Sequence, residues 1–218
     1  MEEKVIIAAT TNKHKIVEIS AITGKFGFSV ISRADAGVPD FEVEENGTTF
    51  EENSFVKAKA IMDYTGKPTI SDDSGLEVDA LNGAPGVYSA RFAEESRDIQ
   101  DFANAEKNPA ERSLQDRANN EKLLRILKDI PFEKRTARFV SVITLLVPGK
   151  EPIVCRGEVE GHVAFEQIGK NGFGYDPMFI PLGHDTTFGV IPPEEKNKMS
   201  HRYNALAKLN ARLSEDSI

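Results

Sequence analysis

Residues 135–163 read RTARFVSVITLLVPGKEPIVCRGEVEGHV and predict two long strands joined by a short loop. Both runs, 135–147 and 153–163, are rich in β-branched and aromatic residues, which favour strands. The connection at 148–152 contains Pro and Gly, the residues that turn a chain back on itself. This part of the chain therefore predicts an antiparallel hairpin, and the sheet that contains it is not purely parallel.

Working outward from this hairpin, further strands and helices follow without strict alternation. The apolar periodicity predicts helices at 13–23, 49–64, 123–130 and from 193 onward, and strands at 5–9, 28–32, 69–71 and 76–80, with a turn at 72–75. Thr49 and Glu52, like Thr48 and Glu51, have the spacing of a capping box at the start of the second helix. This mixture predicts an α/β (mixed) fold: a long mixed, largely antiparallel sheet with flanking helices.

Composition limits the classes of function. The chain has 218 residues, which suits one domain or two closely packed lobes, and a net charge of −8 argues against binding the backbone of a nucleic acid. Cys155 is the only cysteine, so neither an internal disulfide nor a cysteine-based zinc site is expected. There is no apolar run of membrane-spanning length and no signal-like N-terminus, so we expect no membrane partner and a cytoplasmic location.

The segment Thr10-Thr11-Asn12-Lys13-His14-Lys15 lies between a predicted strand and a predicted helix. Free N–H groups at a helix start bind anions, and the two lysines add positive charge. A capped helix with surface lysines is the alternative. The chain contains no P-loop motif, so any triphosphate is bound in another way.

The acidic pair Asp72-Asp73, followed by Ser74-Gly75, is the main candidate for chemistry. Side chains of neighbouring residues point to opposite faces within a regular strand, but at a turn both carboxylates could approach one metal ion. Hard oxygen ligands suit Mg²⁺, and a carboxylate near it can accept a proton from water. An acidic turn that caps its own backbone is the alternative. The acidic run at 42–47 could complete the metal site, and Lys57 could reach a phosphate.

Two later segments could contact a nucleotide. In the stretch 172–177, which reads GFGYDP, glycines let the backbone approach a ligand and Phe173 or Tyr175 could stack on a base. In the stretch 194–202, Lys196, His201 and Arg202 supply donors at the start of the last helix. A tight loop with core aromatics and a charged helix start are the alternatives.

These motifs, in this order, resemble the inosine triphosphate pyrophosphatase family, also called the non-canonical purine NTP pyrophosphatases. Asp-Asp-Ser-Gly alone would be modest support, but the collinear set is specific and covers nearly the whole chain. The matching segments are Thr10-x-Asn12-x-x-Lys15, Thr49-Phe50-x-Glu52-Asn53, Asp72-Asp73-Ser74-Gly75-Leu76, Gly83-Ala84-Pro85-Gly86-x-Tyr88-Ser89-Ala90-Arg91, Arg138-Phe139, Gly172-Phe173-Gly174-Tyr175-Asp176-Pro177 and Ser200-His201-Arg202.

The resemblance implies Mg²⁺-dependent hydrolysis of ITP, dITP and XTP to the monophosphate and pyrophosphate. It also implies one elongated, two-lobed domain over residues 1–218 with a cleft between the lobes, usually as a homodimer. By motif match, Asp73 is the proton acceptor and a Mg²⁺ ligand, Glu45 is the second metal ligand and Asp72 is a supporting carboxylate. The residues that match nucleotide contacts are Thr10, Thr11, Asn12, Lys13, His14, Lys15, Lys57, Ser74, Phe173, Gly174, Tyr175, Asp176, Lys196, His201 and Arg202.

One segment departs from the family pattern. Residues 94–115 form a longer stretch than the family leads us to expect, and we interpret it as a surface insertion. Three other functions compete with the family reading. They are a pyrophosphatase for pyrimidine or modified nucleotides, a nucleotide sensor without turnover, and an interaction protein that uses the segment 93–118.

Overall fold

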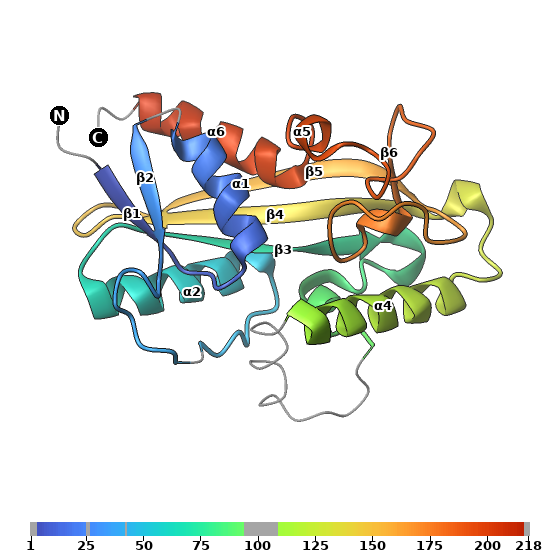
Figure 1. Ribbon diagram of the computed structural model, residues 1–218, viewed down its shortest axis with the longest axis horizontal. Helices are drawn as coiled ribbons and strands as arrows, with labels where there is room; N and C mark the ends of the chain where they lie inside the picture. Colours follow the sequence, from blue (N-terminus) through green and yellow to red (C-terminus); the bar gives the residue numbers. More distant parts are fainter. Residues whose placement is uncertain (1–3, 25–26, 42, 94–108, 216–218) are drawn as a thin grey trace. The chain divides into compact units, whose positions relative to one another are not determined.

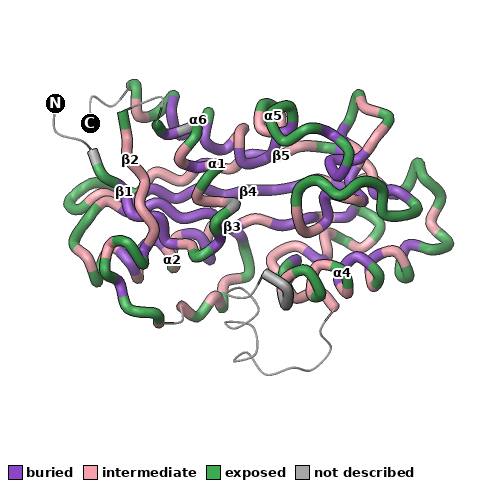
Figure 2. Tube along the Cα trace, in the orientation of Figure 1, coloured by how far each residue is buried: buried purple, intermediate pink, exposed green. Residues whose placement is uncertain are grey.

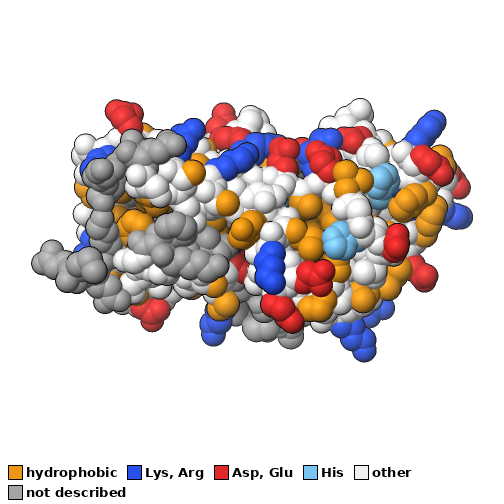
Figure 3. Space-filling model, turned by 90° about the horizontal axis from the view of Figure 1, so that it is seen from above, with side chains coloured by type: hydrophobic (Ala, Val, Ile, Leu, Met, Phe, Trp, Pro, Cys, Tyr) orange, Lys and Arg blue, Asp and Glu red, His pale blue; other side chains and the backbone are white. Residues whose placement is uncertain are grey.

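The computed structural model describes residues 4–24, 27–41, 43–93 and 109–215. The chain divides into two compact units. Unit 1 comprises Met1–Asp73, Ser141–Gly157 and His201–Ile218, and unit 2 comprises Ser74–Val140 and Glu158–Ser200. No helix in the described ranges has both the length and the apolar character needed to cross a bilayer. Acidic and basic side chains are interspersed with hydrophobic ones on the face seen in Figure 3.

The predicted mixed α/β fold is confirmed (Figure 1). One sheet has the strand order β2-β1-β3-β4-β5-β6, in which β1 runs parallel to β2 and β3, and β5 runs antiparallel to β6. The strands are β1 Lys4–Ala8, β2 Phe28–Ser32, β3 Thr69–Val78, β4 Thr136–Leu146, β5 Ile153–Val163 and β6 Phe179–Pro181. The longer helices are α1 Lys13–Thr23, α2 Phe50–Thr65, α4 Pro109–Ile126 and α6 His201–Glu215, and α5 Pro193–Lys196 is a single turn. The predicted hairpin corresponds to β4 and β5.

The predicted turn at residues 72–75 is wrong, because β3 continues through it as a strand of ten residues. The residues favour a turn locally, but β3 pairs with β1 on one side and β4 on the other, and eight of its residues are buried. Sheet pairing and burial therefore keep this segment extended. Gly75 permits this packing, since a Cβ at that position would lie 2.5 Å from the carbonyl oxygen of Gly86. The continuous strand restores the strict alternation of side chains along the acidic pair.

In unit 1, alternation along β1 assigns each helix to a face of the sheet. Ile6 and Ala8 belong to a core cluster with residues of α1 and α6, such as Ile19 and Leu206. The intervening Ile7 packs in a second cluster with residues of α2. Period-two alternation puts these two sets on opposite faces. Accordingly, α1 and α6 cover one face and α2 covers the other (Figure 1).

The α2 helix starts as the sequence predicts. Thr49 is its N-cap: the side chain of Thr49 accepts from the Glu52 N–H, and the Glu52 side chain accepts in return from the N-cap backbone. Gly66 ends the helix in the left-handed region at φ 64°. These two ends fix where α2 begins and ends. In the first half of the helix, the hydroxyl of Ser54 forms a hydrogen bond of 2.8 Å with the hydroxyl of Ser71 on β3.

Unit 2 has its own hydrophobic core. It combines residues of β3, α4, β4, β5 and β6, and β4 is buried along most of its length (Figure 2). Leu123 and Leu127, which the sequence places on an apolar stripe, are fully buried, whereas Ile126 of the same predicted stripe is 43% exposed. Residues 94–108 of the predicted insertion lie outside the described residues. Residues 109–115 form the first two turns of α4.

Gly157 offers a test of how α6 is seated on β5 in unit 1. A Cβ there would lie 2.1 Å from the backbone nitrogen of Ala205 and 2.3 Å from the carbonyl oxygen of His201. We expect Gly157→Ala to push α6 away and to lower the free energy of unfolding by about 2 kcal/mol. Gly24→Ala, whose Cβ meets nothing within 4 Å, should change it by less than about 0.5 kcal/mol in the same denaturant titration. Equal effects of the two changes would contradict this packing.

Candidate active site

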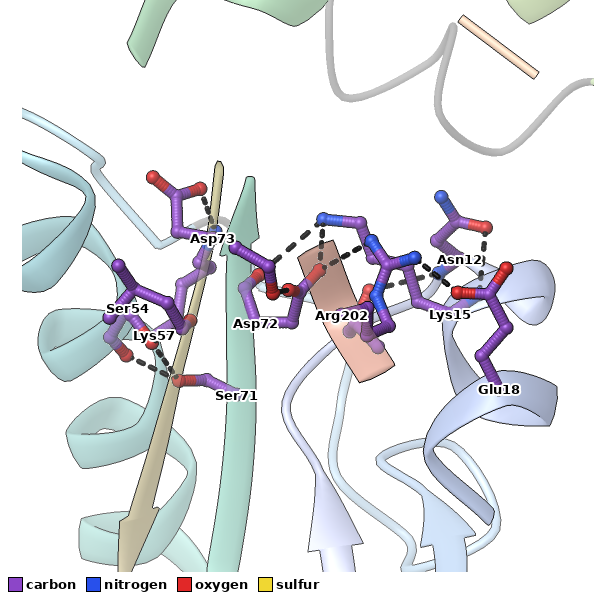
Figure 4. A network of polar contacts seen from close by, with 12 residues as sticks. Asn12, Lys15, Glu18, Ser54, Lys57, Ser71, Asp72, Asp73 and Arg202 are labelled. Carbon is purple, nitrogen blue, oxygen red and sulfur yellow. Dashed lines mark hydrogen bonds and ion pairs between the residues drawn. The ribbon is translucent and has the colours of Figure 1, made fainter. Parts of the chain in front are cut away.

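Asp72 and Asp73 are neighbours on β3, so their side chains point to opposite faces of the sheet. Asp72 lies on the face covered by α1 and α6, and Asp73 lies on the face covered by α2 (Figure 4). The two carboxylates therefore form ion pairs with different cations, although the charge of Lys15 also acts on Asp73.

Asp72 is the centre of a buried ion cluster. Its Oδ2 lies 2.7 Å from the ammonium of Lys15 and 3.1 Å from the guanidinium of Arg202, and its Oδ1 accepts from Ser141 at 2.5 Å. Arg202 also donates to Glu18 of α1. Burial by itself would raise the pKa of Asp72, but Arg202 and Lys15 outweigh it and hold that pKa well below its usual value. Asp72 is therefore ionised throughout the ordinary pH range.

Asp73 belongs to a second, less enclosed cluster. The ammonium of Lys57 on α2 lies 2.6 Å from Asp73 Oδ1 and 2.9 Å from Glu45 Oε2. Burial raises the pKa of Asp73, against the attraction of Lys57. Burial acts to lower the pKa of Lys57, but the two carboxylates outweigh it and raise that pKa. The side chains of Asp73 and Glu45 remain 12% and 36% exposed, compared with 0% for Asp72.

The carboxylates of Glu45 and Asp73 fit a Mg²⁺ ion. They already converge on one cation, the ammonium of Lys57, in a partly exposed position. Mg²⁺ typically takes one or two protein carboxylates and completes its shell with water and substrate phosphates. Within residues that the structure describes, no group of three or more His, Cys, Asp or Glu side chains could hold a metal by itself. Water and substrate phosphates would complete the shell of such an ion.

The loop that carries Glu45 is held at both ends. At its C-terminal end, the Asn53 side chain accepts from the Gly47 N–H at 2.8 Å and donates to the Gly47 carbonyl at 3.4 Å. Near its start, the buried Arg33 donates to two loop carbonyls at 2.9 Å each. These contacts keep Glu45 within reach of Lys57.

The predicted anion loop is a capped helix start. Asn12 is buried, and its side-chain oxygen accepts a long hydrogen bond of 3.5 Å from the Lys15 N–H, as an N-cap does. Its own N–H donates to Thr10 Oγ1 at 3.2 Å. Thr11 and Lys13 are exposed. The side chain of His14 lies outside the described part of the structure.

In unit 2, the loop at residues 172–176 is built around Asp176. Its buried carboxylate accepts from the Lys196 ammonium at 2.5 Å and from the Phe173 N–H at 2.9 Å. Gly172 has a φ of 76°, and a Cβ on it would lie 1.9 Å from Asp176 Oδ2, so a side chain at this position would displace the carboxylate. Tyr175 is a core residue: it is 5% exposed and donates to the Ser89 carbonyl at 2.8 Å. Phe173 is therefore the aromatic candidate for stacking on a base.

The fold and these two polar clusters can be compared with known proteins. Residues 6–212 match the Ham1 family. The chain belongs to that family.

Its relatives have similar lengths. The chain is 46% identical over 204 residues to the dITP/XTP pyrophosphatase of Halalkalibacterium halodurans, covering 94% of this chain and 96% of that protein. It is 44% identical over 207 residues to the dITP/XTP pyrophosphatase of Bacillus subtilis, covering 95% and 96%. The solved structure of the Staphylococcus aureus Ham1 protein superposes with a TM-score of 0.81 at 40% identity, covering 98% of this chain and all of the other.

The structure groups the residues selected from the sequence by unit. Within unit 1 it brings together Glu45, Lys57 and Asp73 in one cluster, and Lys15, Asp72 and Arg202 in the other. His201 is buried at the start of α6. Within unit 2 it brings together Phe173, Asp176 and Lys196, and Ser74 is half-buried on β3. The separate roles assigned to these residues stay predictions.

Sequence reasoning missed several residues that support these clusters. Glu18 lies one turn after Lys15 on α1, and this spacing could have pointed to it. Ser141 of β4 carries no such signal, because only sheet pairing brings it to Asp72. Asp116 and Asn120 on α4 bond the backbone of Gly174, although the segment around them reads as a plain charged surface.

The Asp72 cluster predicts a large effect on stability. Asp72→Asn keeps the shape but leaves Lys15 and Arg202 buried beside a neutral amide, so the free energy of unfolding should fall by about 3 kcal/mol. Because the folded pKa is lowered, this stabilisation is present above the unfolded value of about 4 and is lost as the pH falls below it. Denaturant titration at pH 7 measures the change.

The matched control is Asp63→Asn, which breaks an exposed i,i+4 pair with Lys59 on α2. We expect it to cost about 0.5 kcal/mol or less. If Asp72→Asn is as mild as Asp63→Asn, the buried cluster does not stabilise the fold.

Proposed function

We propose that this chain hydrolyses inosine and xanthosine triphosphates, including the deoxy forms, to the monophosphate and pyrophosphate. The observation that carries the proposal is the cluster of Asp73, Lys57 and Glu45, in which a partly exposed carboxylate with a raised pKa lies beside a cation. The names of the Ham1-family relatives, dITP/XTP pyrophosphatase, support the substrate class.

In this proposal, Asp73 accepts the proton of the water that attacks the α-phosphorus. A carboxylate whose pKa is raised toward neutrality is a better general base than an ordinary one. Lys15 and the N–H groups at the start of α1 offset phosphate charge, and Lys57 holds Asp73 in place. Asp72 acts indirectly, because it fixes the ammonium of Lys15. Positioning and electrostatics then supply most of the rate enhancement.

We also propose that Glu45 and Asp73 hold Mg²⁺ when the triphosphate is present. The support is their convergence on the ammonium of Lys57. When bound, the ion would neutralise phosphate charge and stabilise the pyrophosphate that leaves. Lys57 would then keep its contact with one carboxylate edge and compensate part of the remaining charge.

Base choice in this proposal depends on hydrogen-bond donors facing position 6 of the purine. Inosine and xanthosine present an acceptor there, whereas adenine presents an N–H donor. A buried donor left without a partner costs about 1–3 kcal/mol. Within unit 2, we assign base contacts to Phe173, Asp176 and Lys196, following the family resemblance.

The direct test is pyrophosphate release by the purified chain from inosine triphosphate with Mg²⁺. We expect inosine monophosphate and pyrophosphate in equal amounts, measured by ion-exchange chromatography, with a preference over ATP of about 10- to 100-fold. UTP and TTP in the same panel test the alternative of a pyrimidine pyrophosphatase. Binding of inosine triphosphate without any product would indicate a sensor and overturn the proposal.

Asp73→Asn tests the proton acceptor. It keeps the shape of the side chain and removes the base, so kcat should fall by about 10²- to 10⁴-fold while the thermal midpoint stays close to that of the wild type. Asp63→Asn on the exposed side of α2 serves as the control and should keep full activity. A folded Asp73→Asn enzyme with more than a tenth of the wild-type kcat would remove Asp73 from this role.

Metal removal tests the second proposal. Dialysis against a chelator should abolish turnover, and Mg²⁺ should restore it, because without the ion the carboxylates and the triphosphate repel one another. Glu45→Gln should raise the Mg²⁺ concentration for half-maximal rate by about 10-fold or more, since it removes one of two protein ligands. Full activity in the presence of chelator would contradict a metal requirement.

The homodimer and the cytoplasmic location stay predictions that come from the sequence. Sedimentation of the purified chain tests the first. Removal of residues 94–108, followed by the pyrophosphate assay, tests whether the function depends on that segment, as the alternative of an interaction protein requires.

A further inference from the structure

In unit 2, helix α4 holds the backbone of the loop at residues 172–176 through two side chains one turn apart. Asp116 accepts from the Gly174 N–H at 2.9 Å. Asn120 donates to the Gly174 carbonyl at 3.0 Å and to Gln167 at 3.2 Å. Residues four apart lie on the same helix face, so both polar groups of one loop residue meet one face of α4.

This attachment matters because the loop has unusual backbone freedom. Gly172 and Gly174 both adopt positive φ values, 76° and 60°, which are easily reached only by glycine. Two glycines on either side of Phe173 would let its ring take many orientations. Side-chain bonds to both polar groups of Gly174 remove that freedom.

Helix α4 is itself firmly seated. Leu123 and Leu127 are fully buried in the core of unit 2. On the adjoining face, Asn119 donates to the carbonyls of Ser89 and Ala90 at 3.2 and 3.0 Å and accepts from the Ala93 N–H at 2.7 Å. The helix therefore provides a fixed support for the loop.

The partial burial of Asp116 is another indication of a specific role. Burial and the nearby charge of Asp176 raise its pKa, against the hydrogen bond from Gly174 and the charge of Arg112. Placing a carboxyl in such surroundings is unfavourable unless its bonds compensate. The Asp116 carboxyl does not stabilise α4 itself, but it binds the Gly174 N–H of the loop.

The orientation of Phe173 is further limited by two cations. The guanidinium of Arg112, one turn before Asp116, lies 5.7 Å from the centroid of the Phe173 ring, and the ammonium of Lys196 lies 5.2 Å from it. The Phe173 N–H is bound by Asp176. Main chain and ring are thus both fixed, one by hydrogen bonds and the other by cation–π contacts.

We propose that Asp116 and Asn120 are positioning residues for purine selection: by holding Gly174 they keep the ring of Phe173 oriented for stacking on the base. Neither residue touches substrate in this proposal. The proposal rests on the proposed function, since it concerns how the same enzyme chooses its base. It assigns α4 to substrate discrimination, whereas the sequence predicts only a surface insertion at 94–115 and a helix at 123–130.

The test compares Asp116→Ala and Asn120→Ala with two reference variants. Asp116→Asn keeps an acceptor for the Gly174 N–H and should rescue most of the effect. Arg117→Ala removes an exposed residue that forms an ion pair with Glu121 on the same helix, and it should behave as the wild type. Thermal midpoints of all four variants identify any that fails to fold.

The first measurement is hydrogen–deuterium exchange of the peptide spanning residues 172–176, without nucleotide. We expect faster exchange in both alanine variants, wild-type exchange in Arg117→Ala and near-wild-type exchange in Asp116→Asn. Unchanged exchange in the alanine variants would show that Asp116 and Asn120 do not hold the loop at residues 172–176.

The second measurement is steady-state kinetics with inosine triphosphate and ATP. In the alanine variants KM for inosine triphosphate should rise about 10-fold while kcat changes less than about twofold, because a disordered ring loses stacking. Stacking itself does not distinguish purines, but a base that the ring no longer holds is poorly aligned with the donors at position 6, so the preference over ATP should also fall. An equal loss of kcat for both nucleotides with unchanged KM, or unchanged kinetics despite faster exchange, overturns the role in selection.

The two proposals fail in different ways. If the proposed function is wrong, the wild type releases no pyrophosphate from either purine triphosphate. The role in selection is then wrong as well. Hydrogen–deuterium exchange still tests whether α4 holds the loop at residues 172–176. Failure of the positioning role appears only in the variants, against an active wild type.

Discussion

The rest of the site depends on one constraint: two neighbouring carboxylates on an uninterrupted strand must point to opposite faces of the sheet. Asp72 is thereby placed under α1 and α6, where Lys15 and Arg202 neutralise it, and Asp73 is placed under α2, beside Lys57. A buried carboxylate without such partners would be strongly unfavourable. The helices on both faces of unit 1 therefore each bring a cation to β3.

The opposite orientation of Asp72 and Asp73 gives the two carboxylates different surroundings. Asp72 is fully enclosed and stays ionised, so it holds Lys15 and Arg202 in place and has no access to solvent. Asp73 keeps some exposure and a raised pKa, which suit a group that exchanges protons. The two neighbouring carboxylates thus have different burial and opposite pKa shifts, because each lies on a different face of the sheet.

In unit 2, side-chain hydrogen bonds fix the backbone of a loop. Its loop at residues 172–176 gains freedom from two glycines and loses it again through bonds from α4. In unit 1, Asn53 fixes Gly47 and hence the loop of Glu45 in the same way, by binding both polar groups of one glycine. In both units, polar side chains that bind the N–H and the carbonyl of one glycine fix the backbone of a loop.

Local signals in the sequence were sufficient for much of this protein. The capping box of α2, the hairpin at 135–163 and the mixed sheet follow from spacing and pattern, because caps, turns and periodicity act over a few residues. The family resemblance came from the collinear motifs, and the match to the Ham1 family agrees with it. The tertiary structure alone decided the rest. Residues 72–75 form part of a strand and not a turn, and Tyr175 lies in the core. Ser141 and Arg202 contact Asp72 although they are 69 and 130 residues away in the sequence. Sheet pairing and burial make those contacts between distant segments, and no local pattern records them.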